Sequence, residues 1–575
     1  MYQKTYLFGK DRIHSSILYK EENGYGFVTE QNRNHTPGLQ IAELNSAFEP
    51  YYWLQNQNLT HLSEDESSCF ISKNDSDMDT SDSWKYLPLI FKADVPESGN
   101  YLVTITFSSQ FDLNNAMIFT GRRRFAFLDD MKANERRTIT VAVNVTDIIP
   151  RGYSNRYTDH SIDVTLLGAG LCLHEIDIQQ ADIPTIYIAG DSTVTDQSGS
   201  YPYSPEQCYN GWGQDLSLYL EPSISVANHA HSGLTTESFR EEGHYAIVMD
   251  TIRPGDFFFI QFAHNDQKLS HLQYNGGYRD NIIRYIKEVQ NKGAHPVIVT
   301  PLARNTWKGD GSYNDLLKNF AEECRKIGET YQVPVLDLNR RSTAFILEGG
   351  LEDRKRYFFP NDYTHTNDYG GYVMAGFIAK EICETFKKSP YTKIASLVRE
   401  NHSHFIPPQT IEAVKPPKGY ENETATKPLF EDLERPNELA TRADALAFVI
   451  QAARFFPTNV YNDMYEDVVG HEWYAGTVEC AYQNGMIDPA LVNNGKLSPL
   501  APITLEEYLS VCISAYKSRK TINSLSPCAL DSSCHVWAKE YIRAAFQLGI
   551  IDENVNLNQQ ISRKQAADIA STLNI

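Results

Sequence analysis

The chain has 575 residues, of which 41% are apolar and 22% are charged, and its formal net charge at pH 7 is −21. The length predicts three or four domains, and the apolar share excludes an intrinsically disordered chain. An acidic surface repels phosphate backbones and anionic lipids, which argues against nucleic acids and membrane surfaces as partners.

Neither a secretory signal nor a membrane span is predicted. Charged residues interrupt residues 1–16 before an apolar run of ~7–15 residues develops. No segment reaches the ~20 apolar residues of a transmembrane helix. With Met1 as the natural start we expect a cytoplasmic protein, and another start would leave a cell-surface location open.

The nine cysteines are scattered, and their odd number argues against a disulfide scaffold. Cys528 and Cys534 are close enough for a metal site or a disulfide. No second pair and no histidine set accompanies them, so ordinary thiols are the simpler interpretation. We expect neither a metal ion nor a cofactor.

Residues 1–180 are predicted to form an all-β sandwich. Segments 101–107 and 138–143 alternate apolar and polar side chains with a period of two, as half-buried strands do, and turn formers at 97–100 precede the first. A galactose-binding-like sandwich with a carbohydrate-binding role is the hypothesis for this region.

From residue 184 to residue 390 short apolar runs alternate with helical segments. Segments 185–189, 257–262 and 296–300 indicate buried strands, and the amphipathic stretch 281–289 indicates a helix between the last two. Strand, helix and strand in succession favour a three-layer α/β domain, with a parallel sheet covered on both faces.

Residues 391–435 are predicted to be a linker, because proline pairs punctuate a polar run. Residues 436–575 are predicted to be all-α and weakly repetitive. Three helix-like runs open at similar sequences about 60 residues apart, beginning at Ala440, Ile503 and Ile561, which indicates an internal repeat.

The first chemical motif is Gly190–Thr193, directly after the first predicted strand of the α/β region. Sites in parallel α/β sheets form at the carboxyl ends of strands, so Ser192 is a candidate nucleophile. Taken alone, the motif is better explained as a helix cap, because Asp, Ser and Thr are all cap formers.

The second motif is Asp362 and His365, some 170 residues further on. A nucleophilic serine needs a base, and the base needs a carboxylate that orients it. An Asp and a His three residues apart can pair and leave the other imidazole nitrogen for Ser192. The alternative is a polar loop in which the two residues meet by coincidence.

Asn265 and Gly233 complete the set, because each follows a predicted strand. An asparagine amide can donate an N–H to an oxyanion, and a glycine can offer a backbone N–H without a side chain in the way. Each alone is explained as turn chemistry. Their common place in one α/β region favours an ester-cleaving site.

Together these residues resemble the SGNH or GDSL-type hydrolases, and within them the rhamnogalacturonan acetylesterase-like branch. Further stretches are similar to that branch: Gly211–Gly213, Arg253–Asp256 and Thr300-Pro301, and more weakly Gly24–Phe27 and Gly121–Arg124.

The resemblance implies a serine esterase that needs no metal and removes acetyl groups from plant cell-wall polysaccharide or oligosaccharide. Rhamnogalacturonan or pectin is the first candidate and xylan the second. Ser192 would be the nucleophile, His365 the general base and then acid, and Asp362 the residue that orients it. The N–H groups of Ser192 and Gly233 and the side chain of Asn265 would form the oxyanion hole.

Two residues depart from the pattern of the family. Ala263 replaces a glycine before His264, which narrows the approach to the oxyanion. Leu234 replaces an arginine that could have met an acidic pectin. Aromatic and polar residues near the motifs are candidate sugar contacts: Trp212, His264, Tyr274 and Trp307.

The C-terminal repeats resemble S-layer homology modules, which bind secondary cell-wall polysaccharide. Thr441–Asp444 keeps their motif, whereas Leu505 and Gln565 break it in the second and third copies. Wall anchoring, packing and oligomerisation therefore stay open. Two alternative functions for the whole chain are a non-catalytic cell-envelope carbohydrate-binding protein and a lipid or thioester hydrolase of the same superfamily.

Overall fold

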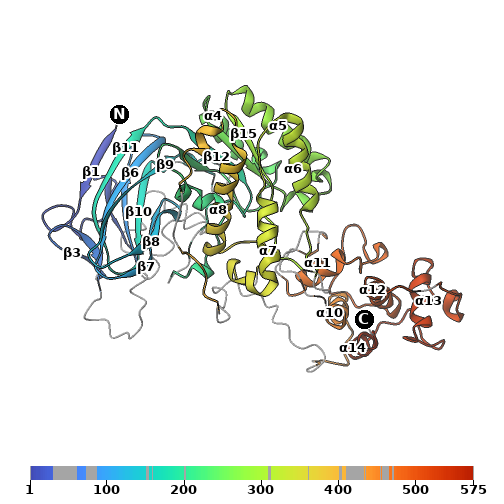
Figure 1. The fold of residues 1–575 in the computed structure, drawn as a ribbon. Coiled ribbons are helices and arrows are strands. Elements are labelled where there is room, and N and C mark those ends of the chain that lie inside the picture. Colours follow the sequence, from blue (N-terminus) through green and yellow to red (C-terminus); the bar gives the residue numbers. More distant parts are fainter. Residues whose placement is uncertain are drawn as a thin grey trace. The chain divides into compact units, whose positions relative to one another are not determined.

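Figure 1 shows the fold of the protein as a computed structural model. It describes the residues 2–29, 61–72, 87–149, 155–157, 159–197, 199, 203–307, 312–360, 362–399, 404–409, 433, 435–453, 455, 457, 465, 467–468, 472–522 and 524–573. Among the helices of these segments, none is both long and apolar enough to span a bilayer.

The chain divides into two compact units. The first comprises Met1–Arg304, Leu316–Pro360 and His365–Pro417. The second comprises Asn305–Asp315, Asn361–Thr364 and Lys418–Ile575. Two short loops of the α/β sequence therefore belong with the C-terminal helices.

The described residues of the N-terminal β region, between 2 and 181, contain two antiparallel sheets. One has the order β3-β4-β11-β6-β9, with β1 also paired to β11, and the other has the order β2-β5-β10-β7-β8. The strands are β1 (Gln3–Leu7), β2 (Tyr25–Val28), β3 (Leu62–Glu64), β4 (Cys69–Ile71), β5 (Pro88–Asp94), β6 (Gly99–Ser109), β7 (Leu113–Thr120), β8 (Arg124–Met131), β9 (Arg136–Val145), β10 (Ser161–Leu167) and β11 (Leu171–Ala181).

The two sheets share one apolar core. On β6 the alternate residues Val103, Ile105 and Phe107 are fully buried, as the period-two pattern predicts. Phe107 meets Phe127 of the other sheet at 4.9 Å between ring centroids. The galactose-binding-like identity of this region and its carbohydrate-binding role stay predictions.

The α/β region carries a five-stranded parallel sheet of order β13-β12-β14-β15-β16. The strands are β12 (Thr185–Gly190), β13 (Ser225–Asn228), β14 (Phe257–Gln261), β15 (His295–Val299) and β16 (Val335–Leu336). The helices are α2 (Trp212–Asp215), α3 (Ser238–Glu241), α4 (His244–Thr251), α5 (Gly277–Asn291), α6 (Lys318–Tyr331), α7 (Leu338–Arg354), α8 (Asp368–Thr385) and α9 (Thr392–Ala395).

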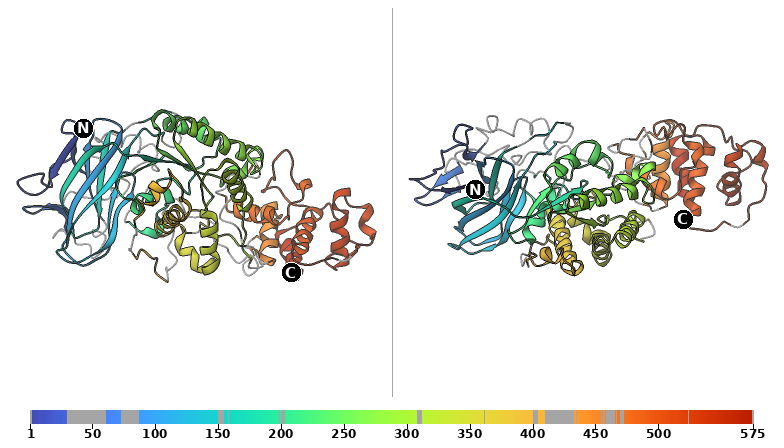
Figure 2. Two further views of the ribbon diagram at one scale, coloured as in Figure 1. Left: turned by 45° about the horizontal axis from the view of Figure 1, so that its top comes forward. Right: turned by 90° about the horizontal axis from the view of Figure 1, so that it is seen from above.

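Helices cover both faces of this sheet. Figure 2 shows the green helices α5 and α6 on one face and the yellow helices α7 and α8 on the other. On α5 the buried side chains Ile282, Tyr285, Ile286 and Val289 recur every three or four residues, which places one stripe against the sheet. The predicted strands and the helix between them are confirmed.

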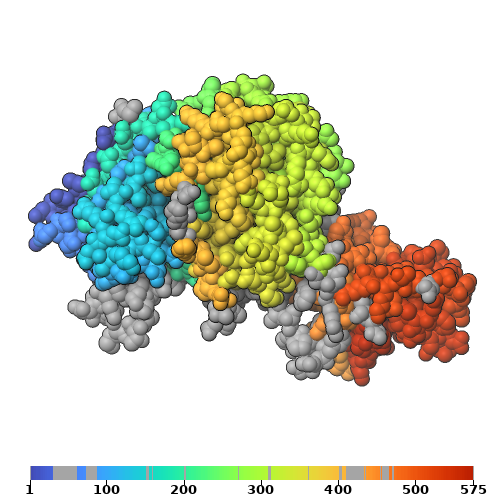
Figure 3. All heavy atoms as spheres, in the orientation of Figure 1, coloured from blue at the N-terminus to red at the C-terminus, as the bar shows by residue number. Residues whose placement is uncertain are grey.

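The predicted linker begins later than expected, because residues 391–399 and 404–409 are part of the first unit and contribute to its packing. Ile394 and Phe405 are buried, and Val398 forms a β-bridge with Leu220. Phe405 also meets Phe125 of the β region at 5.8 Å. In Figure 3 the orange segment that includes α9 lies beside the cyan and blue-green β region. Most of the remaining predicted linker lies outside the described residues.

The second unit contains α10 (Arg442–Ala452), α11 (Ala475–Gln483), α12 (Leu505–Lys517), α13 (Lys539–Gln547) and α14 (Arg563–Thr572). Thr441, Thr504 and Ser562 each cap a helix with a reciprocal capping box.

The residues before these three caps hydrogen-bond to one another in a ring. Ala440 N–H donates to Ile561 O, Ile561 N–H to Ile503 O, and Ile503 N–H to Ala440 O. The three helix starts thus share a capping box and a place in this ring, and the repeat of the whole modules stays a prediction. Binding of wall polysaccharide by them stays a prediction.

Candidate active site

Ser192 lies two residues beyond the carboxyl end of β12, the second strand of the parallel sheet. The turn requires glycine at position 190, because a Cβ there would lie 2.7 Å from Val194 and 2.9 Å from the Gln261 carbonyl oxygen. Ser192 is half-buried, and its Oγ lies 2.7 Å from Nε2 of His365. The predicted nucleophile and base therefore meet across 173 residues of sequence.

His365 occupies the loop that leads into α8. Its carbonyl accepts a hydrogen bond from the Phe359 N–H at 3.0 Å. The ring of Tyr209 meets the imidazole edge-on at 5.7 Å and stacks on Phe359 at 3.7 Å between centroids. These contacts hold the imidazole with Nε2 toward Ser192.

Asp362 is half-buried and accepts the backbone N–H of Thr364 at 2.8 Å, which fixes the turn that precedes His365. It lies in the short loop that belongs to the second unit. Its predicted pairing with His365 stays a prediction.

Gly233 lies at the third position of a turn in which the Leu234 N–H donates to the His231 carbonyl at 3.3 Å. Its φ of +88° is favourable only for glycine, as in a type II turn. No other described atom lies within 4 Å of where a Cβ would be, so the approach to its N–H is open.

Asn265 follows β14, and its Nδ2 donates to the Leu234 carbonyl at 3.0 Å. An amide nitrogen carries two N–H groups, so one holds the side chain beside the Gly233 turn and the second can meet an oxyanion. Among the described residues, the backbone N–H groups of Ser192 and Gly233 have no hydrogen-bond acceptor. The three predicted oxyanion donors are thus grouped around the ends of adjacent strands.

The two departures from the family pattern have structural consequences. Ala263 has a φ of +138°, a conformation in which a Cβ is strained, so the alanine stores strain two residues before Asn265. Leu234 is buried in the apolar core, and its backbone carbonyl anchors Asn265.

Two buried carboxyl groups brace the loops of the site. Asp191 accepts the N–H and the hydroxyl of Thr193, and Asp266 does the same for Thr236. In each carboxyl the second oxygen has no hydrogen-bond partner among the described residues. Burial raises the pKa of both, that of Asp266 to about 7 with a smaller contribution from the charge of Asp191.

Gln197 is a bracing residue that the sequence reasoning missed. Its Nε2 donates to the Ser192 carbonyl at 3.2 Å and to the Ser232 hydroxyl at 3.4 Å. It therefore links the nucleophile loop to the turn of Gly233. A glutamine in a loop gives no sequence signal of this kind.

An arginine cluster joins the β region to the site. Arg123 is buried and forms an ion pair with Asp368, the first residue of α8 and three residues after His365. Arg124 pairs with Asp196 at 2.7 Å, beyond the nucleophile turn. The stretch Gly121–Arg124, singled out in the sequence only by resemblance, thus provides one contact between the two regions.

Two predicted sugar contacts are wrong. Trp212 is fully buried, and its indole N–H donates to Gln261 Oε1 at 2.8 Å. His264 is 2% exposed, and its Nε2 bonds to the Leu302 carbonyl at 3.0 Å. Burial also lowers the pKa of His264 well below its ordinary value, so it is neutral. Both side chains pack beneath the site.

The other two predicted contacts stay predictions. Tyr274 is half-buried and meets Phe320 edge-on at 6.0 Å. Trp307 belongs to the second unit, where its indole N–H donates to Asn305 Oδ1 at 2.8 Å.

Comparison with known proteins agrees with this geometry. Residues 188–371 match the model of the GDSL-like Lipase/Acylhydrolase family. The chain is 36% identical over 210 residues to the probable rhamnogalacturonan acetylesterase YesY of Bacillus subtilis (strain 168), an alignment that covers 35% of this chain and 92% of that protein.

Two further relatives align with similar shares of this chain. The rhamnogalacturonan acetylesterase RhgT of Bacillus subtilis (strain 168) is 30% identical over 212 residues, which covers 35% of this chain and 89% of that protein. The rhamnogalacturonan acetylesterase of Emericella nidulans is 28% identical over 226 residues, which covers 35% of this chain and 85% of that protein. The chain belongs to the GDSL-like lipase/acylhydrolase family and is a carboxylic ester hydrolase.

Proposed function

We propose that the protein removes acetyl groups from plant cell-wall carbohydrate, with acetylated rhamnogalacturonan as the first substrate class. The observation that carries the proposal is the 2.7 Å contact between Ser192 Oγ and His365 Nε2 at the carboxyl end of β12. The substrate class is supported by relatives that are named rhamnogalacturonan acetylesterases.

The reaction would proceed in two acyl transfers. Ser192 Oγ attacks the ester carbonyl carbon while His365 Nε2 accepts the hydroxyl proton. The negative charge that develops on the carbonyl oxygen is met by the N–H groups of Ser192 and Gly233 and by Asn265. His365 then returns the proton to the departing sugar oxygen, which leaves an acetyl group on Ser192.

Water completes the cycle. His365 takes a proton from the water molecule as it attacks the acetyl-serine carbonyl, and the same donors receive the second oxyanion. Acetate departs when the C–O bond to Ser192 breaks and His365 returns the proton to Oγ. Asp362 is proposed to stabilise the imidazolium that forms twice in each turnover.

The test is acetate release by the full-length chain from a panel of acetylated rhamnogalacturonan, homogalacturonan and xylan oligosaccharides. Ser192→Ala is expected to abolish release, whereas Ser396→Ala, an exposed serine on the same unit, is expected to leave it unchanged. Acetate release by a folded Ser192→Ala variant would refute the proposed mechanism. Faster turnover of long-chain esters than of any acetylated sugar would favour the lipid hydrolase instead.

A further inference from the structure

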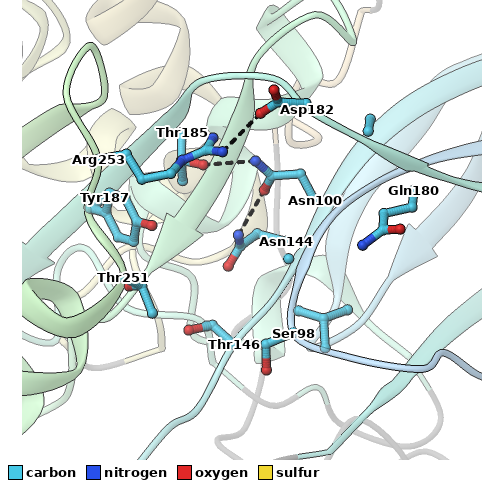
Figure 4. Close-up of a pocket in the computed structure, with 13 residues that line it drawn as sticks. Ser98, Asn100, Asn144, Thr146, Gln180, Asp182, Thr185, Tyr187, Thr251 and Arg253 are labelled. Carbon is cyan, nitrogen blue, oxygen red and sulfur yellow. Dashed lines mark hydrogen bonds and ion pairs between the residues drawn. The ribbon is translucent and has the colours of Figure 1, made fainter. Parts of the chain in front are cut away.

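A cleft of about 530 Å³ lies where the β region meets the amino end of the parallel sheet (Figure 4). Its size falls within the ~300–1,000 Å³ of small-molecule sites, which often form between domains. The ends of β6, β9 and β11 form one wall, and β12 and the segment after α4 form the other. The polar side chains that line it are Ser98, Asn100, Asn144, Thr146, Gln180, Asp182, Thr185, Tyr187, Thr251 and Arg253.

Two asparagine amides on one wall of the cleft, Asn100 of β6 and Asn144 of β9, are fixed by a series of hydrogen bonds. Asn144 Nδ2 donates to Asn100 Oδ1 at 2.7 Å. Asn100 Nδ2 in turn donates to the Ile183 carbonyl and to the Thr185 hydroxyl, each at 2.9 Å. This series crosses from the β region to β12 and determines which atom of each amide is oxygen and which is nitrogen.

This series of hydrogen bonds leaves one acceptor without a donor. Asn144 Oδ1 is buried and accepts no hydrogen bond from any described residue. In Figure 4 this oxygen is directed away from Asn100, toward the space in front of Tyr187, Thr251 and Thr146. A buried acceptor without a donor is destabilising, so a ligand hydroxyl that donates to it would be favoured.

The charges of the cleft are already matched. Arg253 donates to Asp182 Oδ1 and to the Ile183 carbonyl, each at 2.8 Å. Among the described residues that line the cleft, Arg253 and Asp182 are the only charged ones. Burial raises the pKa of Tyr187, so its phenol stays neutral. A carboxylate ligand would meet a guanidinium that is already paired, whereas a neutral ligand rich in hydroxyl groups finds amides, hydroxyls and one aromatic ring.

We propose that this cleft binds a neutral sugar unit and serves as a holding site for the polysaccharide. Thr185 begins β12 and Ser192 follows its end, so the cleft lies roughly 20 Å from the nucleophile at ~3.3 Å per residue and takes no part in the chemistry. The polysaccharide as ligand rests on the proposed function, but binding of the sugar does not.

The experiment uses the full-length chain with Ser192→Ala, titrated by calorimetry with methyl rhamnoside, methyl galactoside, methyl xyloside and galacturonic acid. At least one neutral glycoside is expected to bind, and galacturonic acid at least 10-fold more weakly. Adding Asn144→Ala should weaken binding about 10-fold, the effect of one hydrogen bond. Thr146→Val, which alters the cleft without changing the hydrogen bonds of Asn100 and Asn144, should also weaken binding of the glycoside. Asn114→Ala, which replaces an exposed asparagine on β7, should leave binding unchanged.

Activity separates this proposal from the esterase. With Ser192 intact, Asn144→Ala should hydrolyse a small acetyl ester at the unchanged rate and lose efficiency only on polymer. Absence of binding by all three neutral glycosides would overturn the holding site. So would binding that neither Asn144→Ala nor Thr146→Val weakens, or tighter binding of galacturonic acid. Sugar binding without any acetate release would leave the site standing and refute the acetylesterase.

Discussion

The two ends of the parallel sheet differ in how their polar groups are satisfied. At the amino end, Asn100 donates hydrogen bonds to Thr185 and to the Ile183 carbonyl that Arg253 also contacts, and one buried acceptor, Asn144 Oδ1, has no donor among the described residues. At the carboxyl end, strain at Ala263 and two half-paired buried carboxyls surround a serine and a histidine in contact. Proton transfer at the carboxyl end needs side chains whose hydrogen bonds can change during the reaction. Ligand binding at the amino end needs side chains whose hydrogen bonds hold them in place.

The largest effect is expected from removal of the base at the carboxyl end of the parallel sheet. His365→Ala should lower kcat by about 10⁴-fold or more with little change in KM, because the proton on Ser192 Oγ then has no acceptor. Steady-state kinetics on a small acetyl ester measure it. Replacement of the exposed His271 by alanine is the control. A loss below 10-fold would show that the carboxyl end is not the catalytic end.

Arg123→Met tests whether the β region stabilises the carboxyl end of the parallel sheet, where the active site lies. The change leaves Asp368 buried without its ion-pair partner, which should cost about 3–5 kcal/mol of unfolding free energy. Urea denaturation of the full-length chain measures it. Arg137→Met, which breaks partly exposed ion pairs on β9, should cost at most ~1 kcal/mol. Equal losses in the two variants would mean that Arg123 does not link the regions.

Asn265→Ala measures how much one donor of the oxyanion hole contributes to catalysis. Loss of one donor should lower kcat by about 100-fold or more, or ~3 kcal/mol of transition-state stabilisation. The exposed Asn275→Ala is the matched control. An unchanged kcat would assign Asn265 only to its hydrogen bond with the Leu234 carbonyl.

The smallest effect is a dependence of stability on pH. The raised pKa of Asp266, about 7, lies above the ordinary value near 4, so between these values the folded state holds a proton that the unfolded state has released. Stability therefore falls as pH rises from about 4 to about 7. Asp266→Asn keeps the acceptor for Thr236 and should flatten this slope, as followed by thermal unfolding at several pH values. The exposed Asp280→Asn should leave the slope in place.

The sequence predicted the strands and the site best at positions where the structure accepts only one or two residue types. Gly190, Gly233 and Ser192 lie at strand ends, and the structure gives each glycine a steric or conformational reason. Period-two alternation predicted β6, since Val103, Ile105 and Phe107 on one face are fully buried.

Other features depend on tertiary contacts that no local pattern carries. Trp212 and His264 were assigned to substrate because aromatic rings and imidazoles suit both sugar clefts and cores, and burial decides for the core. The role of Arg123 depends on Asp368, 245 residues away. The unpaired Asn144 oxygen follows only from the three-dimensional course of this series of hydrogen bonds.

The central claim is that Ser192, activated by His365, forms the acyl-enzyme. The most direct measurement is covalent labelling of the full-length chain with a serine-directed fluorophosphonate, located by peptide mass spectrometry. The account predicts one labelled residue, Ser192, with labelling slowed at least 100-fold in His365→Ala. Labelling at another serine, or equal rates in the two proteins, would contradict it.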